Sequence, residues 1–378
     1  MPTYWIMSGE ASGDLYGAEL ARALKARCPE AVVRGMGGVQ MKAAGVDIMV
    51  DSTELGIIGI WEALRHLPFF IRLRRTLAQR AAEERPDTVV MIDYPGFNLS
   101  LASQLHKHGI RVVWYISPQV WAWRTGRIWK LAKYCSRMLC IFPFEPPYYA
   151  PTTLKAEFIG HPLVGQLAPY RRSEAERQKA TVLLLPGSRR QELRRLLQPM
   201  LETAAYLHRR NPALHFEIAF PRQAIADYAD ELMAQMHLPD GMPEIKRFCG
   251  ETRERMAVAS AALAASGTVT VEAALLGLPV VVTYKVNALT YLLGRLVLKI
   301  NTITIANLVC KRKVFEEFIQ GDCNAETLGR AMEAILPGGA RREACLAGIR
   351  EFTESLGAGG DVAANAAAAV LEPEKDGK

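Results

Sequence analysis

The sequence predicts an α/β protein made of two domains, each with its own parallel sheet. At 378 residues, half of them hydrophobic, the chain is longer than most single domains. A buried strand, a glycine-bearing turn and a helix follow one another from Thr3 and again from Thr181, which is the pattern of an open α/β sheet. We expect domains at 1–165 and 170–350, separated near the charged segment 171–179, with an Ala-rich helix at 358–372 returning to the first domain.

Composition limits the function classes without choosing one. The net charge of +7 suits anionic small molecules, an anionic membrane surface or nucleic acid. No nucleic-acid-binding motif is present, and the aromatic residues cluster in one loop instead of forming a stacking platform. The seven cysteines contain no CxxC pair, so reduced cytosolic thiols are expected. The first residues show no signal-peptide pattern.

The first βα unit has a strand at Thr3–Ser8, a loop at Gly9–Asp14 and a helix from Leu15 to about Arg27. The loop lacks the GxGxxG spacing of dinucleotide sites, so no nicotinamide cofactor is expected. Its acids, Glu10 and Asp14, repel a diphosphate and suit the hydroxyl groups of a sugar better. The carboxyl end of this strand is therefore a candidate sugar site.

A second carboxylate follows the next buried strand, Asp87–Ile92. Asp93 lies at the carboxyl end of that strand, just before a Pro-Gly turn, where catalytic groups of α/β enzymes often lie. The alternative is that Asp93 only caps the helix expected over Asn98–Lys107 or closes its own turn. Both interpretations are compatible with the sequence.

Two further segments of the first half carry large apolar side chains. Residues 59–75 combine Trp61, Phe69 and Phe70 with several arginines, which fits either a membrane-touching element or ordinary core packing. The loop after the strand at 111–116 contains Trp121, Trp123 and Arg124. Those side chains form either a wall of a sugar- or chain-binding site or a packing cluster.

The most apolar stretch, 256–284, contains one charged residue, Glu272. We expect a strand at Ala261–Ala265, a turn through Ser266, Gly267 and Thr268, and a helix from Thr268 to Leu276, followed by a second strand. Amides at that helix N-terminus favour a phosphate, and Glu272 on the same face can hold a hydroxyl-rich ligand. The alternative is a buried Glu272 paired with an arginine from elsewhere. The turn Gly187-Ser188-Arg189 likewise suits an anion.

Five blocks together resemble one family. They are Gly9–Asp14, Tyr115–Arg124, Ile159–Pro162, Leu185–Arg189 with Glu192, and Ala265–Thr268 with Glu272. In this order they resemble the motifs of the lipid-A-disaccharide synthases, inverting GT-B glycosyltransferases with two Rossmann-like domains and a cleft between them. The resemblance spans residues 3 to about 330. The tryptophan-rich block is specific to that family, whereas the Ser-Gly-Thr…Glu block is shared by many GT-B enzymes, including transferases and epimerases acting on other UDP-sugars.

The resemblance implies transfer of 2,3-diacylglucosamine from its UDP conjugate to the 6-hydroxyl of 2,3-diacylglucosamine 1-phosphate. The alternative is a GT-B transferase or epimerase acting on another UDP-sugar, against which the tryptophan-rich block argues. A carboxylate of the first domain is then expected to be the catalytic base, Asp93 by preference, with Glu10 and Asp14 as alternates. Implied donor-binding residues are Gly187, Ser188, Arg189, Ser266, Gly267, Thr268, Glu272 and Asn307, and acceptor-binding residues are Glu10, Ser12, Gly13, Asp14, Trp121 and Arg124. We expect no cofactor and no metal site, since Asp-x-Asp is absent from the sequence. A homodimer is expected, cytoplasmic and peripheral on the inner face of the inner membrane.

The chain departs from the family pattern in three places. The usual Leu-Pro-Asn-Leu-Leu is Ile305–Val309 here, which keeps Asn307 and loses the proline. The usual Pro-Glu is Glu316-Glu317. Gly96 replaces a second acid found in some members, so Asp93 is the only acid in its loop.

Overall fold

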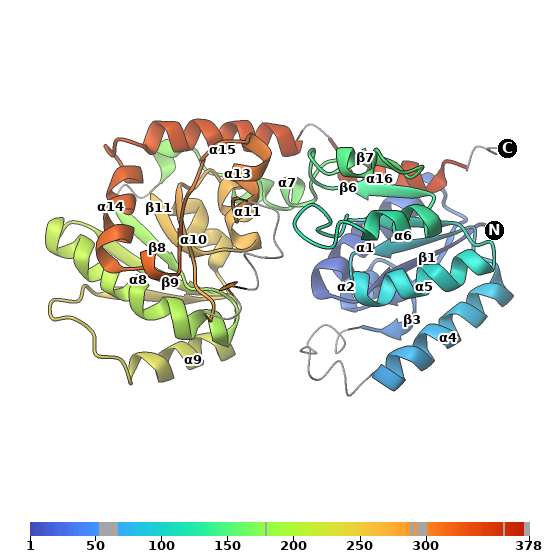
Figure 1. The fold of residues 1–378 in the computed structure, drawn as a ribbon, viewed down its shortest axis with the longest axis horizontal. Helices are drawn as coiled ribbons and strands as arrows, with labels where there is room; N and C mark the ends of the chain where they lie inside the picture. Colours follow the sequence, from blue (N-terminus) through green and yellow to red (C-terminus); the bar gives the residue numbers. More distant parts are fainter. Residues whose placement is uncertain (53–66, 178–179, 288–290, 293–300, 358–359, 374–378) are drawn as a thin grey trace. The chain divides into compact units, whose positions relative to one another are not determined.

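The computed structural model describes residues 1–52, 67–177, 180–287, 291–292, 301–357 and 360–373 (Figure 1). The chain forms two compact units. Unit 1 contains Met1–Pro162 and Leu356–Lys378, and unit 2 contains Leu163–Ser355. In the described ranges, no helix combines the length and apolar character needed to span a membrane.

Unit 1 is built on a seven-stranded parallel sheet with the order β3-β2-β1-β4-β5-β6-β7. The strands are β1 (Thr3–Ser8), β2 (Val32–Gly37), β3 (Asp47–Asp51), β4 (Thr88–Ile92), β5 (Val112–Tyr115), β6 (Arg137–Cys140) and β7 (Lys155–Phe158). The strand order reverses between β1 and β4. In an open α/β sheet, ligands bind outside the carboxyl ends of the strands at such a point.

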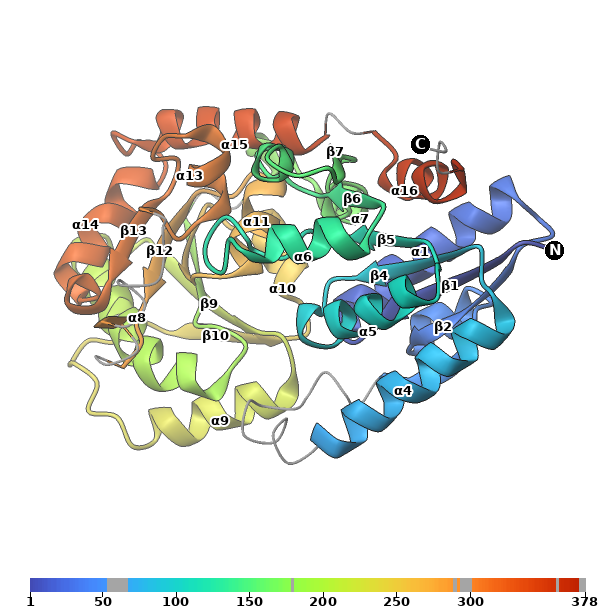
Figure 2. The same cartoon turned by 45° about the vertical axis from the view of Figure 1, so that its right-hand side comes forward.

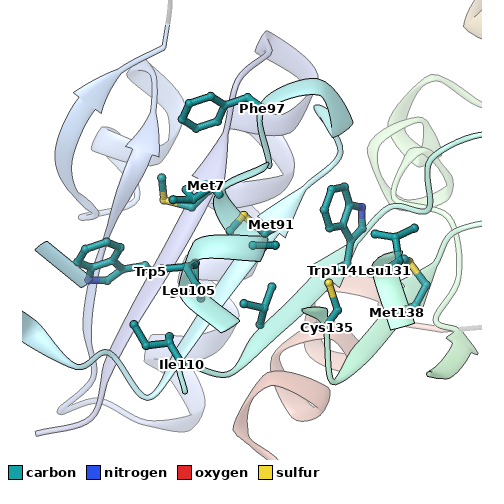
Figure 3. Close-up of a cluster of buried hydrophobic side chains, with 14 of the residues drawn as sticks. Trp5, Met7, Met91, Phe97, Leu105, Ile110, Trp114, Leu131, Cys135 and Met138 are labelled. Carbon is teal, nitrogen blue, oxygen red and sulfur yellow. The ribbon is translucent and has the colours of Figure 1, made fainter. Parts of the chain in front are cut away.

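Helices cover both faces of this sheet, and the strands alternate accordingly. The helices are α1 (Ala11–Arg27), α2 (Val39–Ala43), α4 (Leu67–Glu84), α5 (Pro95–Lys107), α6 (Arg127–Tyr134) and α16 (Val362–Leu371). Trp5 and Met7 of β1 pack into the cluster with α4, α5 and α6 (Figure 3). Tyr4 and Ile6 point the other way and pack with α1 and α16. Burial on both faces accounts for the near-continuous apolar strands.

The C-terminal helix α16 completes unit 1, lying beside α1 (Figure 2). Its apolar residues Val362, Ala366 and Val370 belong to the second buried cluster of that unit. Arg111 donates to the Val370 carbonyl at 2.7 Å, at the C-terminal end of the helix. A cation there satisfies a carbonyl that the helix itself leaves unpaired.

Unit 2 repeats the design with a six-stranded parallel sheet of order β10-β9-β8-β11-β12-β13. Its strands are β8 (Thr181–Leu185), β9 (His215–Phe220), β10 (Ile245–Cys249), β11 (Ala261–Ala265), β12 (Val280–Tyr284) and β13 (Glu316–Ile319). Its α-helices are α7 (Leu163–Gln166), α8 (Arg190–Arg210), α9 (Gln223–Met233), α10 (Thr252–Val258), α11 (Thr268–Leu275), α13 (Ile305–Cys310), α14 (Ala325–Ile335) and α15 (Arg342–Gly357). The order reverses between β8 and β11. The predicted α/β class with two parallel sheets is confirmed.

Two details differ from the sequence-based expectation. Helices α1 and α5 begin about one turn earlier than expected, at Ala11 and Pro95, because small residues and a proline are tolerated in a first helical turn. The segment 171–177 is part of unit 2 and not a linker. Arg177 is buried and donates to the carbonyls of Met256 and Ala259 at 3.0 Å, which ties the segment to α10.

Candidate active site

Unit 2 has a pocket of about 620 Å³ at the carboxyl edge of its sheet, where the strand order reverses. The turns after β8 and β11 form much of its wall, with further residues from the ends of β9 and β10 and Tyr170 from before β8. Of the residues predicted to bind the donor, the pocket is lined by Gly187, Ser188, Arg189, Ser266, Gly267, Thr268 and Glu272. Residues 80 positions apart in the chain thus meet in one cavity, as expected for the switch point of such a sheet.

The first turn of α11 faces this pocket, because Thr268 and Val269 line it. Gly267 precedes the helix with φ +155° and ψ −166°, a conformation that is essentially confined to glycine. A Cβ on Gly267 would meet no atom within 4 Å, so the space in front of the helix is open. A helix N-terminus that opens onto a cavity favours an anionic group there.

Glu272 is paired with an arginine and lines the pocket at the same time. Arg253, in the first turn of α10, directs Nη2 and Nε at Glu272 Oε1, at 2.6 and 3.1 Å. Both residues line the pocket, and the Glu272 side chain is 16% exposed. The two interpretations of this carboxylate are therefore compatible: its charge is balanced by Arg253, and it still reaches the cavity.

The turn after β8 is organised by its own carboxylate. Glu192 Oε2 accepts the amides of Ser188 and Arg189 at 2.9 and 3.2 Å. Gly187 has φ +114°, and a Cβ on it would lie 2.3 Å from that same oxygen. Since Glu192 already occupies these amides, the expected anion site in this turn is reduced to the Arg189 side chain, which is 81% exposed.

Asn307 has a different environment from the one implied by the family resemblance. It does not line the pocket. Its Oδ1 accepts the amides of Val314 and Phe315, both at 2.8 Å, and its Nδ2 donates to the Phe315 carbonyl and to Glu317, both at 2.9 Å. All four hydrogen bonds that an amide side chain makes are used, which indicates that Asn307 fixes α13 against β13.

In unit 1, Asp93 lies at the switch point in a strained turn. Asp93 and Tyr94 have φ +41° and +49°, which is uncommon for residues with a side chain. Asn98 holds this geometry: it is fully buried and donates to the Asp93 carbonyl at 2.8 Å. Burial, reinforced by the negative charge of Glu10, raises the pKa of Asp93 to about 6, and the Tyr94 amide partly opposes the shift. That value suits a general base near neutral pH.

The predicted loop Gly9–Asp14 is Gly9 and Glu10 followed by the first turn of α1, and it contains exposed and structural residues. Glu10 and Ser12 are exposed, whereas Gly13 and Asp14 are buried. Both oxygens of Asp14 accept amides in front of and within α2: Gly38 at 2.6 Å, Met41 at 3.1 Å and Gln40 at 2.9 Å. The prediction for Asp14 must therefore be revised, since its carboxylate caps a helix. Gly13 lets α1 approach β1, because a Cβ there would lie 2.4 Å from Ser8 Oγ.

The tryptophan-rich loop also contains both exposed residues and buried residues with a packing role. Trp121 is 6% exposed and packs edge-on against Phe144, with ring centroids 5.3 Å apart. Trp123 is 37% exposed, and the Arg124 guanidinium lies 4.5 Å from its ring centroid. Packing thus explains Trp121, while Trp123 and Arg124 remain available at the surface.

Sequence reasoning missed Arg253, Asn98 and Glu145. Glu145 is 2% exposed, and burial raises its pKa to about 8 although the amides of Phe142 and Ile141 donate to it. Asn98 and Glu145 are polar residues that are buried by the fold, and hydrophobic periodicity in the sequence does not mark such positions. Arg253 stands in an ordinary charged segment, where only the fold reveals its partner. The described part of the chain contains no group of three His, Cys, Asp or Glu side chains placed to hold a metal ion.

Comparison with known proteins identifies the family. The model of the lipid-A-disaccharide synthetase family matches residues 4–370. A lipid-A-disaccharide synthase of Myxococcus xanthus is 37% identical over 378 residues, covering 98% of this chain and 97% of that protein. Among solved structures, the glycotransferase of kitacinnamycin has a TM-score of 0.64 at 16% identity over 98% of both chains. The S. aureus MnaA–UDP co-structure has a TM-score of 0.62 at 11% identity, over 97% of this chain and 94% of that one. The chain belongs to the lipid-A-disaccharide synthase family, whose members are glycosyltransferases.

Proposed function

We propose that this enzyme transfers 2,3-diacylglucosamine from its UDP conjugate to the 6-hydroxyl of 2,3-diacylglucosamine 1-phosphate, releasing UDP with inversion. The family membership supports the reaction. The observation that carries the donor site is that every predicted donor residue except Asn307 lines one pocket of unit 2. A neighbour with the same fold was solved with UDP, which agrees with a nucleotide site in such a protein.

In this proposal the UDP diphosphate lies at the N-terminus of α11 and the ribose hydroxyls bind Glu272. The leaving group gains negative charge as the glycosidic bond breaks, and oriented amides with the exposed Arg189 stabilise that charge. The backbone amides of the turn after β8 contribute less to this stabilisation, because those of Ser188 and Arg189 already donate to Glu192. Asp93 in unit 1 removes the proton from the acceptor hydroxyl, with Glu10, Ser12 and Arg124 near the acceptor.

The direct test is a mass-spectrometric assay with the two acylated glucosamine substrates. We expect a disaccharide 1-phosphate and UDP in equal amounts. UDP-N-acetylglucosamine without acyl chains serves as the comparison substrate. Epimerisation or transfer of that compound, with no disaccharide from the acylated pair, would disprove the proposal.

Removing the side chain of Arg189 is expected to weaken UDP binding. The loss of one charged hydrogen bond costs about 1.5–3 kcal/mol, so the Kd should rise by about 10- to 100-fold in Arg189→Ala, measured by calorimetry. Arg190→Ala is the matched control, because Arg190 lies over the Tyr228 ring at 4.6 Å and does not line the pocket. If the two variants bind UDP with equal affinity, Arg189 does not contribute to the donor site.

Activity is expected to persist in excess EDTA. The chain has no Asp-x-Asp motif, and helix amides with arginine suffice to stabilise the diphosphate. The measurement is the initial rate with and without EDTA, after exhaustive dialysis. A rate that collapses in EDTA and returns with Mg²⁺ would contradict this mechanism.

We further propose that unit 1 binds the cytoplasmic surface of the inner membrane, because substrates with two acyl chains reside there. Of the predicted segment, residues 59–66 lie outside the described residues, and 67–75 form the start of α4. Leu67 and Phe69 are 51% and 47% exposed, next to the exposed Arg72 and Arg75. Apolar side chains beside cations suit an anionic interface. Phe70 instead packs against Phe97, with ring centroids 6.0 Å apart.

Liposome flotation tests this assignment. Leu67→Ser with Phe69→Ser should reduce binding to anionic vesicles while the fold stays intact. Val39→Ser, at an apolar residue of α2 that is 69% exposed, is the control and should float like the wild type. If the double variant floats equally well, α4 is not the contact. The expected homodimer is checked by sedimentation in the same buffer.

A further inference from the structure

The carboxylate of Glu272, in the pocket of unit 2, is held by one arginine, Arg253. Arg253 directs two donors, Nη2 and Nε, at one oxygen of Glu272, Oε1. In the described parts of the chain, the side-chain hydrogen bonds of Glu272 are these two. The second oxygen, Oε2, therefore remains open to another hydrogen-bond donor, and turning the carboxylate breaks both bonds to Oε1.

The surroundings explain why Glu272 depends on this contact. Its neighbours on α11, Val271, Ala273 and Ala274, are buried, and its own side chain is 16% exposed. A carboxylate so placed is costly unless it is paired and hydrogen-bonded. Arg253 comes from α10, which follows the edge strand β10, while Glu272 is on α11, so the pair also joins two walls of the pocket.

We propose that Arg253 is a positioning residue of the nucleotide-sugar site: it acts through Glu272, holding the carboxylate in the orientation that accepts a vicinal diol. This rests on the proposed function, in which the diol is the ribose of UDP. A ribose offers two adjacent hydroxyl donors, and the two lone pairs of Oε2, held in place by the bonds to Oε1, can accept from both. Losing Arg253 therefore removes selectivity for the diol, even though Glu272 itself is unchanged.

Calorimetry with UDP and with its 2′-deoxy and 3′-deoxy analogues separates this role from others. The wild type should prefer UDP by about tenfold or more over at least one analogue, the effect of one charged hydrogen bond. Glu272→Gln and Arg253→Met should each lose most of this preference. Because the residues act as a unit, the double variant should be no worse than Glu272→Gln alone. Arg253→Lys should recover part of the preference. Lys246→Met is the matched control, since it removes an exposed cation from β10 and should behave like the wild type.

The possible outcomes test the role of Arg253 separately from the proposed function on which it rests. If the folded wild type binds none of the three nucleotides, the proposed function is wrong, and the role of Arg253 falls with it. If the wild type discriminates and Arg253→Met keeps the same preference, only the inference is overturned. The same holds if Arg253→Met weakens UDP and both analogues equally, because Arg253 then contacts the phosphates or the base directly. Circular dichroism of each variant confirms that the fold is retained.

Discussion

Replacing Asp93 by asparagine is expected to lower kcat by about 10²- to 10⁴-fold while UDP binding stays unchanged. The substitution keeps the shape of the side chain and removes its basicity, and general-base loss costs that much. UDP binding should survive because the pocket belongs to unit 2, and Asp93 belongs to unit 1. Single-turnover rates with the acylated substrates and calorimetry with UDP measure the two quantities separately.

The pH dependence gives a second readout of the same residue. A base acts when deprotonated, so with a pKa of about 6 the wild-type kcat should rise as the pH increases through 6 and level off above it. Glu10→Gln removes the negative charge that helps to raise this pKa, so the rise should move to lower pH. If Asp93→Asn keeps a near-normal kcat, the base is another group, with Glu10 the next candidate. If the variant unfolds, the carboxylate was needed for its turn.

Replacing Arg177 by methionine is expected to destabilise unit 2 by about 3–5 kcal/mol. The guanidinium is buried and donates to the carbonyls of Met256, Ala259 and Leu276, around the C-terminal ends of α10 and α11. Methionine fills similar space but leaves these carbonyls without a partner, and each buried unpaired group costs about 1–3 kcal/mol.

Thermal unfolding followed by circular dichroism measures this loss. For a domain of this size, 1 kcal/mol corresponds to about 2–4 °C, so the Tm should fall by roughly 10 °C. Arg172→Met is the control in the same segment, because Arg172 is exposed and donates to the carbonyls of Pro169 and Arg171 in its own turn. A Tm equal to that of the control would show that water replaces the guanidinium.

The long apolar strands of the fold were predictable, and the short polar ones were not. Runs such as Thr181–Leu185 and Ala261–Ala265 are buried on both faces and stand out as strands. The edge strand β10, Ile245–Cys249, contains Lys246 and Arg247 and has a half-exposed surface, so it lacks that signal. The strands β6 and β7 are as short as the predicted strand β5, but they contain the charged residues Arg137, Lys155 and Glu157 and so lack its continuous apolar run.

The candidate site was predictable where glycine and strand ends mark it. Gly187, Gly267 and Glu272 follow or flank buried strands, and the parallel topology brings them together. What a side chain contacts is a property of the folded chain: nothing in the sequence indicates that Asp14 caps α2 or that Arg253 reaches Glu272. Hydrogen bonds across 19 or 24 positions become visible only once the elements are placed.

Unit 1 is built from two segments of the chain that are separated by the whole of unit 2, and this has a consequence for folding during synthesis. Its strands and α1 are translated before unit 2, but α16, which packs against α1 and the apolar side chains around it, is translated after unit 2. Unit 2 is continuous in sequence, so its core can form before α16 is made. Until then, the face of unit 1 against which Val362, Ala366 and Val370 pack remains exposed to solvent. Nascent chains stalled before α16 should therefore engage chaperones through the uncovered apolar face of unit 1.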